Sequence, residues 1–556
     1  MTTAFDISAQ YVDALIAIDP LFATGLGVSG HDGEWPDTGL AGAAARTQLY
    51  QRYRQALAAH LDDPDPIQRL AARALTQSMD DEIAAYEHDD HLIDLSHMAS
   101  SFHRYRMVFD VMDDTTPDGW DAICSRLTTI DRAYRGLTER LEAGRAIGNT
   151  VARRQAQSVL EQATQLAGSG SAFESLEQRA ATGNSGVAGL AEAVEHSKRA
   201  AGDFASYLKT TYLPHARSDD GVGAEMYGRL ASRLVGVEVE PTEAYAWGWH
   251  ELARLIIEAE RVGDEIVPGG SLADVTELLE TDPARASDSP EEFIAFIAER
   301  QERALAELDG VHFAVAEPLR TIDVRVAPAG GPLGAYYIRP SEDFTRPGGV
   351  WYSIGDQTTF PLYHHVSTAY HEGFPGHHLQ NGTAMVNAHR ISRGHRLTVW
   401  YPGYGEGWAL YAERLMEEFG YLEVPDYVFG MVAKHLYRAT RVVVDIGLHL
   451  GLRIPDSAPL FGGELWTFDR AVAYLETYGF RTPDQAVNET MRYLGWPGQA
   501  IAYKLGEREL LRLRDDAKRE AGPNFDLSAF HDRVIGNGPM RFDLLREVVL
   551  DRSAAH

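Results

Sequence analysis

A run of ten residues in the second half of the chain limits the possible folds more than any other feature. Residues 371–380 read His-Glu-Gly-Phe-Pro-Gly-His-His-Leu-Gln. The metallopeptidase motif His-Glu-x-x-His places two imidazoles one helical turn apart on a shared metal ion, and its Glu activates water. Here the position four residues after His371 is Pro375, which cannot bind a metal, and the next imidazoles belong to His377 and His378.

The spacing of these histidines requires a break in the helix. On a regular helix a residue seven positions later lies about 10 Å further along the axis, and a residue six positions later points about 120° away. Neither arrangement suits two nitrogens that each lie about 2 Å from one zinc ion. Pro375 removes a helical donor and Gly376 permits unusual dihedral angles, so a bulge is possible here. We favour His377 as the second ligand, because removing a two-residue insert restores the motif, and His378 is the alternative.

A catalytic zinc takes three protein ligands and a water molecule, and Glu406 is the best third candidate. It lies near the start of a helix predicted over residues 405–419. Glu413 follows seven residues later on about the same face, where a carboxylate can orient a ligand imidazole. Glu372, beside a ligand, is the candidate general base. The alternative interpretation is that the helix simply ends at the Pro-Gly pair and binds no metal.

A hydrolase of this kind also needs a donor for the negative charge of the intermediate and a cation for the substrate. Tyr503 and His449 are the candidate donors. Arg492 is the first candidate for a substrate carboxylate, because a guanidinium can bind it through two parallel hydrogen bonds. Arg438 and Arg441 come next, but structural ion pairs are the favoured interpretation for both.

Four segments carry a resemblance to a known family. The motif segment 371–380 resembles the hallmark of a large bacterial family catalogued as domain of unknown function 885. The segment Glu406–Glu413, which reads Glu-Gly-Trp-Ala-Leu-Tyr-Ala-Glu, resembles the second block of that family. Val443–His449 and Pro497–Ala500 with Tyr503 are further similarities, and the resemblance covers most of the chain.

That family is in turn similar to the carboxypeptidase Taq-like gluzincin metallopeptidases. The similarity implies a mainly helical fold: a large multi-helix body around a central cleft, with a small β-sheet before the metal helix. It also implies one Zn2+ per chain and the hydrolysis of peptides by metal-activated water. Those enzymes carry an uninterrupted His-Glu-x-x-His, and this sequence departs from them at its inserted residues.

Periodicity and capping signals agree with a mainly helical chain. Helices are predicted over residues 5–19, 41–58, 66–86, 117–144, 151–166, 187–208, 241–262, 290–308, 427–452 and 500–521. Alternating apolar and polar residues predict short strands over residues 320–326, 335–338 and 349–353. We expect an N-terminal helical region over residues 1–315 and a C-terminal catalytic half over 316–556, which form either two domains or a single body.

The predicted sheet lies just before the motif, where an edge strand can pair with extended substrate backbone. Tyr336 and Tyr337 on this strand would then contact the substrate. A structural hairpin that covers the cleft is an equally good interpretation.

Composition excludes several classes of function. The formal net charge of −30 argues against binding to nucleic acids and to anionic membranes. The single cysteine, Cys124, excludes a disulfide framework and a cysteine metal site. No apolar run is long enough to cross a membrane, and residues 1–10 lack the basic and apolar regions of a signal peptide. We therefore expect a cytoplasmic protein.

The sequence thus predicts a zinc-dependent, carboxypeptidase-like enzyme that acts on peptides. Two alternatives stay open. One is a metal-free helical protein that binds a peptide or another small ligand, and the other is a metallohydrolase of small-molecule amides or esters. The expected partner is a peptide or a small-molecule substrate, and the oligomeric state is left open.

Overall fold

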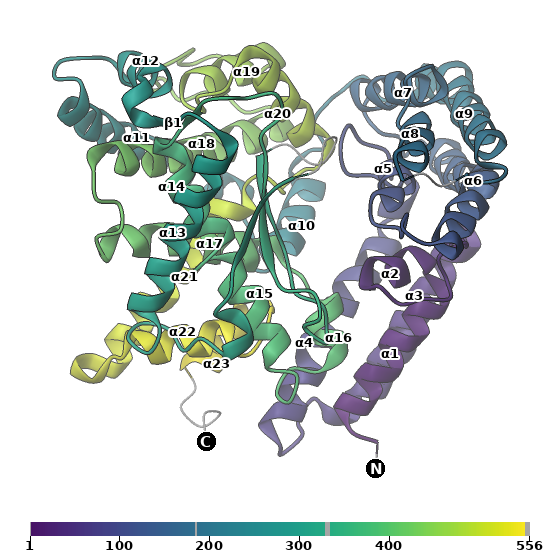
Figure 1. The fold of residues 1–556 in the computed structure, drawn as a ribbon, viewed down its shortest axis with the longest axis horizontal. Coiled ribbons are helices and arrows are strands. Elements are labelled where there is room, and N and C mark those ends of the chain that lie inside the picture. Colours follow the sequence, from purple (N-terminus) through teal and green to yellow (C-terminus); the bar gives the residue numbers. More distant parts are fainter. Residues whose placement is uncertain (1, 184–185, 328–333, 551–556) are drawn as a thin grey trace. The chain divides into compact units, whose positions relative to one another are not determined.

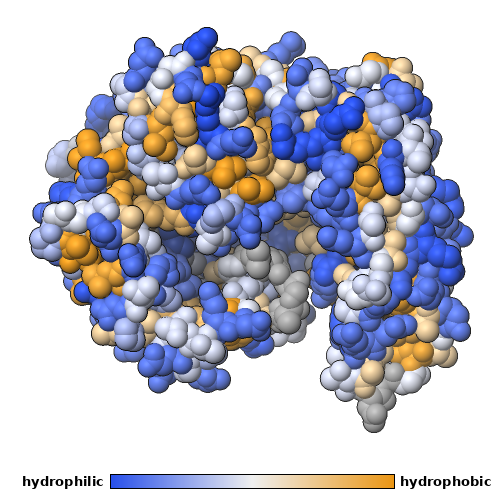
Figure 2. Space-filling model, turned by 90° about the horizontal axis from the view of Figure 1, so that it is seen from above, coloured by the Kyte–Doolittle hydropathy of each residue, from blue (hydrophilic) through white to orange (hydrophobic). Residues whose placement is uncertain are grey.

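The chain folds into helices with two small sheets, in a computed structural model that describes residues 2–183, 186–327 and 334–550 (Figure 1). None of the helices in these ranges is both long and apolar enough to cross a bilayer. The face drawn in Figure 2 carries mostly hydrophilic side chains with scattered apolar patches, in keeping with the large negative charge.

The described chain divides into two compact units. The first comprises Met1–Val222 and Met491–Trp496, and the second comprises Gly223–Thr490 and Pro497–His556. The division expected near residue 315 therefore falls inside the second unit. There the long helix α11 (Pro241–Ile266) packs against α18 (Pro425–Leu450), which ties residues before 315 to residues after it.

The first unit is helical around one long helix, α6 (Pro117–Ala146). Thr116 caps this helix by accepting a hydrogen bond from the Gly119 amide at 3.2 Å. In its core the rings of Tyr134 and Phe204 stack with centroids 5.2 Å apart. The other helices of this unit are α1 (Ala4–Ile18), α2 (Pro20–Leu26), α3 (Leu40–Leu57), α4 (Pro66–Glu87), α5 (Ser101–Met107), α7 (Arg153–Ala167), α8 (Glu174–Thr182) and α9 (Leu190–Tyr207).

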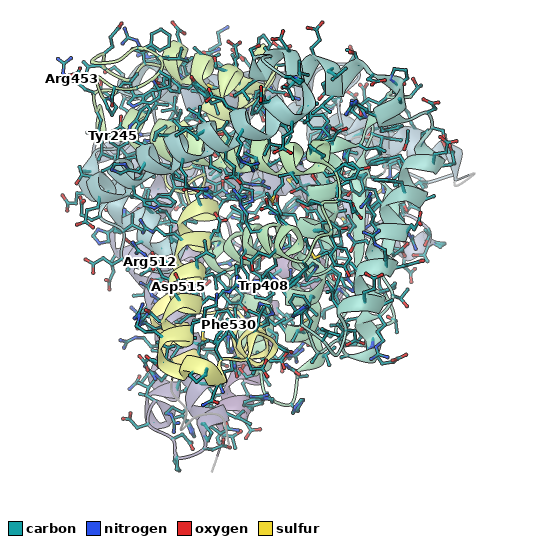
Figure 3. The ribbon with its side chains drawn as sticks, turned by 90° about the vertical axis from the view of Figure 1, so that its left-hand side faces the viewer. Tyr245, Trp408, Arg453, Arg512, Asp515 and Phe530 are labelled. Carbon is teal, nitrogen blue, oxygen red and sulfur yellow. The ribbon has the colours of Figure 1, made fainter. Side chains whose placement is uncertain are left out.

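The second unit contains the motif helices. Besides α11 and α18, its helices are α10 (Ala224–Val235), α12 (Leu272–Thr281), α13 (Pro290–Leu308), α14 (Tyr363–Glu372), α15 (His377–Val386), α16 (Arg393–Thr398), α17 (Pro402–Glu418), α19 (Phe468–Thr477), α21 (Ala502–Ala521), α22 (Leu527–Ile535) and α23 (Phe542–Leu550). One further helix, α20 (Pro483–Gly495), contains residues of both units. Helices α17 and α18 pack against each other, and each of them packs against both α14 and α21 (Figure 1). The Tyr245 hydroxyl of α11 donates to the carbonyl of Arg453 at 3.0 Å, which fixes α11 to the segment after α18 (Figure 3).

A three-stranded sheet precedes α14 in the sequence. Its strand order is β2-β4-β3, with β2 (Asp323–Val326) parallel and β3 (Gly334–Ile338) antiparallel to the central β4 (Gly349–Ser353). A second, two-stranded sheet pairs β1 (Ala286–Ser287) with β5 (Phe360–Pro361). Apolar side chains of β4, α13 and α14 share one core, so the sheet is anchored to the motif helix and β3 lies at its edge.

Helices α17 and α21 approach each other closely at glycines. A Cβ atom on Gly506 would lie 1.9 Å from the carbonyl oxygen of Gly403, and one on Gly407 would lie 2.5 Å from the carbonyl carbon of Gly506. Any side chain at these positions would push the two helices apart. Because α17 carries Glu406, these glycines also set the position of that carboxylate.

We expect Gly506→Ala to lower the free energy of unfolding by about 3 kcal/mol, since its methyl group overlaps backbone that cannot rotate away. The matched control is Gly202→Ala in α9, where the new Cβ would meet only Ala167 Cβ at an ordinary 3.5 Å. That control should be neutral or stabilising by up to about 1 kcal/mol. Thermal unfolding followed by circular dichroism measures both, and equal effects of the two substitutions would contradict the close crossing.

Candidate metal centre

The helix that carries the motif is broken between its two histidine positions. Helix α14 ends at Glu372, and α15 begins at His377. The Phe374–Pro375 peptide bond in the break is cis. A Cβ on Gly376 would lie only 1.9 Å from the carbonyl oxygen of His371, so this close approach requires glycine.

Buried polar side chains hold the break in place from two neighbouring helices. Gln301 of α13 donates to the carbonyl of Ala369 at 2.7 Å and accepts from the amide of Phe374 at 2.7 Å. Trp408 of α17 donates from its indole nitrogen to the carbonyl of Pro375 at 2.9 Å. Trp408 is fully buried and lies beside α22 (Figure 3). The backbone between the histidines is therefore fixed by packing.

Three candidate ligands converge across this break. His371, His377 and Glu406, called the trio below, each offer one ligand atom, and these three atoms lie within 4.8 Å of one another. Glu406 Oε2 lies 3.3 Å from His371 Nε2 and 3.6 Å from His377 Nε2. Ligand atoms around a tetrahedral zinc, each about 2.1 Å from the ion, are about 3.4 Å apart. The donor set of two imidazoles and one carboxylate therefore fits zinc in both chemistry and spacing.

His378, the alternative ligand, points elsewhere. Its Nε2 lies 2.8 Å from the carbonyl oxygen of Leu319. Its ring packs edge-on against Tyr337, with centroids 5.6 Å apart. Of the two imidazoles after the break, that of His377 therefore lies beside His371 and Glu406, and that of His378 contacts the backbone of Leu319 instead.

A buried carboxylate orients the first imidazole. Glu413 Oε1 lies 2.8 Å from His371 Nδ1, which leaves His371 Nε2 facing Glu406. Glu413 also accepts from the hydroxyl of Ser367 and pairs with Arg438 Nη1 at 3.4 Å. Burial alone would raise the pKa of Glu413, but Arg438 and His371 outweigh burial and lower it to about 2. This carboxylate is therefore ionised and fixed, which suits a group that holds the ring of a metal-binding histidine in one orientation.

Two carboxylates, those of Glu406 and Glu413, favour a positive charge on the imidazole of His371 between them. Burial lowers the pKa of His371, but hydrogen bonds to Glu406 and Glu413 outweigh burial and raise it to about 9. Burial acts to raise the pKa of Glu406, but the imidazoles of His371 and His377 hold it well below its ordinary value. Carboxylates gathered around shared imidazoles are an arrangement that a divalent cation can stabilise.

Glu372 lines the same space as the trio. All four side chains border a cavity of about 510 Å3, which we call the metal cavity after its candidate ligands. Burial raises the pKa of the Glu372 carboxyl, although His371 and His377 act in the opposite direction. A carboxyl whose pKa is raised, beside a candidate metal site, is suited to take up and release a proton.

The remaining predicted residues divide into two groups. Tyr503 lines the metal cavity, as do Tyr336 and Tyr337 of the edge strand β3. His449 does not line it and is buried with its Nε2 3.3 Å from Asp445 Oδ1. Arg492 does not line it either and belongs to the segment Met491–Trp496 of the first unit.

Sequence reasoning did not single out Ser367, Gln301 or Arg339. Ser367 lies four residues before His371, so the two share one face of the helix. A carboxylate that contacts His371, as Glu413 does, can therefore also contact Ser367. Gln301 gives no such signal, because its partners lie about 70 residues away. Arg339 lines the cavity from the residue after β3, and its proximity to the motif depends on how the sheet packs on α14.

Comparisons with known proteins give a family and a fold. The model of a family described as bacterial protein of unknown function (DUF885) matches residues 20–549. The solved structure of a putative lipoprotein from Colwellia psychrerythraea is similar with a TM-score of 0.84 and 23% identity, over 99% of each chain. A putative lipoprotein of unknown function from Shewanella oneidensis is similar with a TM-score of 0.73 and 16% identity, over 99% of this chain and 100% of that one. None of the curated proteins matches.

These comparisons correct one expectation. At such identities the likeness shows the fold alone, but both solved structures are of proteins described as putative lipoproteins. Lipoproteins are held at membranes by covalent lipid, so the descriptions contradict the cytoplasmic location expected from the sequence. That expectation depended on the composition of residues 1–10 and on the lack of a long apolar run.

Proposed function

The chain belongs to the bacterial DUF885 family of proteins of unknown function, and we propose from its site that it is a zinc-dependent metallopeptidase. One observation carries the proposal: ligand atoms of His371 and His377, from the two sides of the helix break, and of Glu406, from α17, lie within 4.8 Å of one another. Zinc held by these residues would supply a Lewis acid that activates water and polarises the scissile carbonyl.

Glu372 is the proposed general base. Its carboxyl borders the cavity beside the trio, and burial raises its pKa. In this role it takes a proton from the attacking water and gives it to the leaving amine. Gln cannot do this, although it has nearly the same shape.

Other residues of the cavity supply binding groups. The Tyr503 hydroxyl is the proposed donor to the negative charge that develops on the substrate carbonyl. The edge of β3, with Tyr336 and Tyr337, is a surface on which extended substrate backbone can add as a strand. A volume of about 510 Å3 suits a short peptide segment better than a folded protein.

Metal removal and restoration test the proposal. Purified protein loaded with zinc should contain about one zinc per chain and cleave members of a mixed peptide library, as read by mass spectrometry. Chelation should lower the cleavage rate at least about 100-fold, and added zinc should restore it. Cleavage that survives complete metal removal, or zinc-loaded protein that cleaves no peptide in the library, would contradict the proposed function.

A further inference from the structure

Three arginines line the metal cavity, and two of them have a carboxylate partner. Arg438 Nη1 lies 3.4 Å from Glu413 Oε1, and Arg441 Nη2 lies 3.4 Å from Glu489 Oε2. Both guanidinium groups also lie over the ring of Tyr503, at 5.7 and 5.0 Å from its centroid. These two cations are therefore balanced within the fold.

The third, Arg339, differs from them. Among the residues that the structure describes, no carboxylate lies within ion-pairing distance of its guanidinium. Its hydrogen bond is to the main-chain carbonyl of Arg396, at 3.3 Å. The neighbouring Glu342 already pairs with Arg393 at 3.3 Å and with Arg396 at 3.7 Å. Arg339 is half-buried, and a cation removed from water without a counter-ion is destabilising unless a ligand supplies one.

A second recess opens beside Arg339. Its volume is about 250 Å3, and Arg339, Asn381 and Trp400 line both this recess and the metal cavity. Its wall combines the apolar side chains Ala384, Met385, Leu397 and Val399 with the polar side chains Gln380 and Arg396, and Arg396 already pairs with Glu342. Trp400 is 48% exposed and supplies an open aromatic surface between the two spaces.

This arrangement matches the chemistry of one part of a peptide, its C-terminal residue. There the free carboxylate and the side chain are attached to the same Cα, next to the nitrogen of the last peptide bond. A cation that binds the carboxylate must therefore border both the metal cavity, where that bond would be cut, and a side-chain recess. Arg339 is the one described arginine that lines both spaces and lacks a carboxylate partner.

We propose that Arg339 binds the C-terminal carboxylate of a peptide substrate and that the adjacent recess accepts an apolar terminal side chain. The inference rests on the proposed peptidase function and narrows it to the release of single apolar residues from the C-terminus. A guanidinium suits this task because it can bind a carboxylate through two parallel hydrogen bonds, which a lysine cannot do.

The test compares two N-blocked peptides that end in leucine, one with a free carboxylate and one with a C-terminal amide. Wild-type protein should cleave the acid at least about 100-fold more efficiently, by kcat/KM, than the amide. Arg339→Met should lower kcat/KM for the acid about 100-fold and leave the amide unchanged, because the lost interaction is a charge-assisted hydrogen bond. Arg339→Lys should retain part of the preference.

The matched control is Arg393→Met, which removes a neighbouring guanidinium that pairs with Glu342 and lines neither space. It should leave the preference for the acid intact. Equal cleavage of acid and amide by wild-type protein, or equal loss on both peptides in Arg339→Met, would overturn the assignment. A third peptide, amidated at its C-terminus but with an internal glutamate, tests whether Arg339 binds a side-chain carboxylate instead. If wild-type protein cleaves it faster than the plain amide and Arg339→Met does not, the assignment to a C-terminal carboxylate is overturned.

A binding measurement separates this inference from the peptidase proposal. The zinc-loaded Glu372→Gln protein should bind the acid peptide about 100-fold more tightly than the amide, by calorimetry, and Arg339→Met in that background should remove the difference. If wild-type protein cleaves neither peptide but this difference is present, the peptidase proposal fails and the carboxylate site stands. If wild-type protein cleaves both peptides and the difference is absent, the carboxylate site fails.

Discussion

Glu372→Gln is expected to reduce kcat by at least about 10³-fold while zinc stays bound. Glutamine fills the same volume but cannot accept the proton of the attacking water, and general acid–base catalysis is worth about 10² to 10⁴ in rate. Glu372 is not one of the three converging ligand groups, so its replacement should leave the metal site intact. Because burial disfavours the charged form of Glu372, the neutral amide should also leave stability unchanged or slightly higher.

Three readings check this prediction together: kcat on a cleaved peptide, zinc per chain by elemental analysis, and the melting temperature. The matched control is Glu302→Gln on the exposed face of α13, which should change none of them. Activity within tenfold of wild type would exclude Glu372 as the base. Loss of zinc together with activity would instead make Glu372 a ligand and contradict the assignment of roles.

His377→Ala is expected to empty the metal site, and His378→Ala is expected to leave it filled. Loss of one of three protein ligands leaves two donors for zinc, which is too few for a stable catalytic site. The zinc content of His377→Ala should fall below about one tenth of an equivalent after dialysis against a weak chelator. His378→Ala should keep about one zinc, but it should lose about 2 kcal/mol of stability with its contact to the Leu319 carbonyl.

The adjacent histidines are each other's controls, because they share the same segment and the same residue type. Elemental analysis gives the zinc content, and thermal unfolding with and without added zinc gives the stability. Zinc should raise the melting temperature of His378→Ala and leave that of His377→Ala unchanged. The reverse pattern would move the ligand to His378 and would require the backbone at the break to rearrange.

Much of the helical framework could be predicted because its signals are local. Helix α13 begins at Pro290, after Ser289, whose hydroxyl accepts from the amide of Glu292 at 3.2 Å. The sequence Ser-Pro-Glu-Glu specifies this start without help from other parts of the chain. The strands near residues 323, 334 and 349 were likewise visible as short alternating runs.

Features that depend on distant contacts could not be predicted in the same way. The division into two units follows from which helices pack together, as α11 does on α18, and neither helix encodes its partner in its own periodicity. Spacing suggested a helix break after His371, but its form depends on Gln301 and Trp408, which reach it from α13 and α17. The arginine that binds a substrate carboxylate could not be predicted from the sequence for the same reason. A guanidinium can bind a substrate only if the fold gives it no acidic partner, and that depends on distant contacts.

Anomalous X-ray scattering at the zinc edge, from crystals of the zinc-loaded protein, shows directly whether His371, His377 and Glu406 bind the metal. We expect one strong peak per chain, about 2 Å from His371 Nε2, His377 Nε2 and a carboxylate oxygen of Glu406. A peak bound by other residues, or fully loaded crystals with no peak among these three side chains, would contradict this expectation.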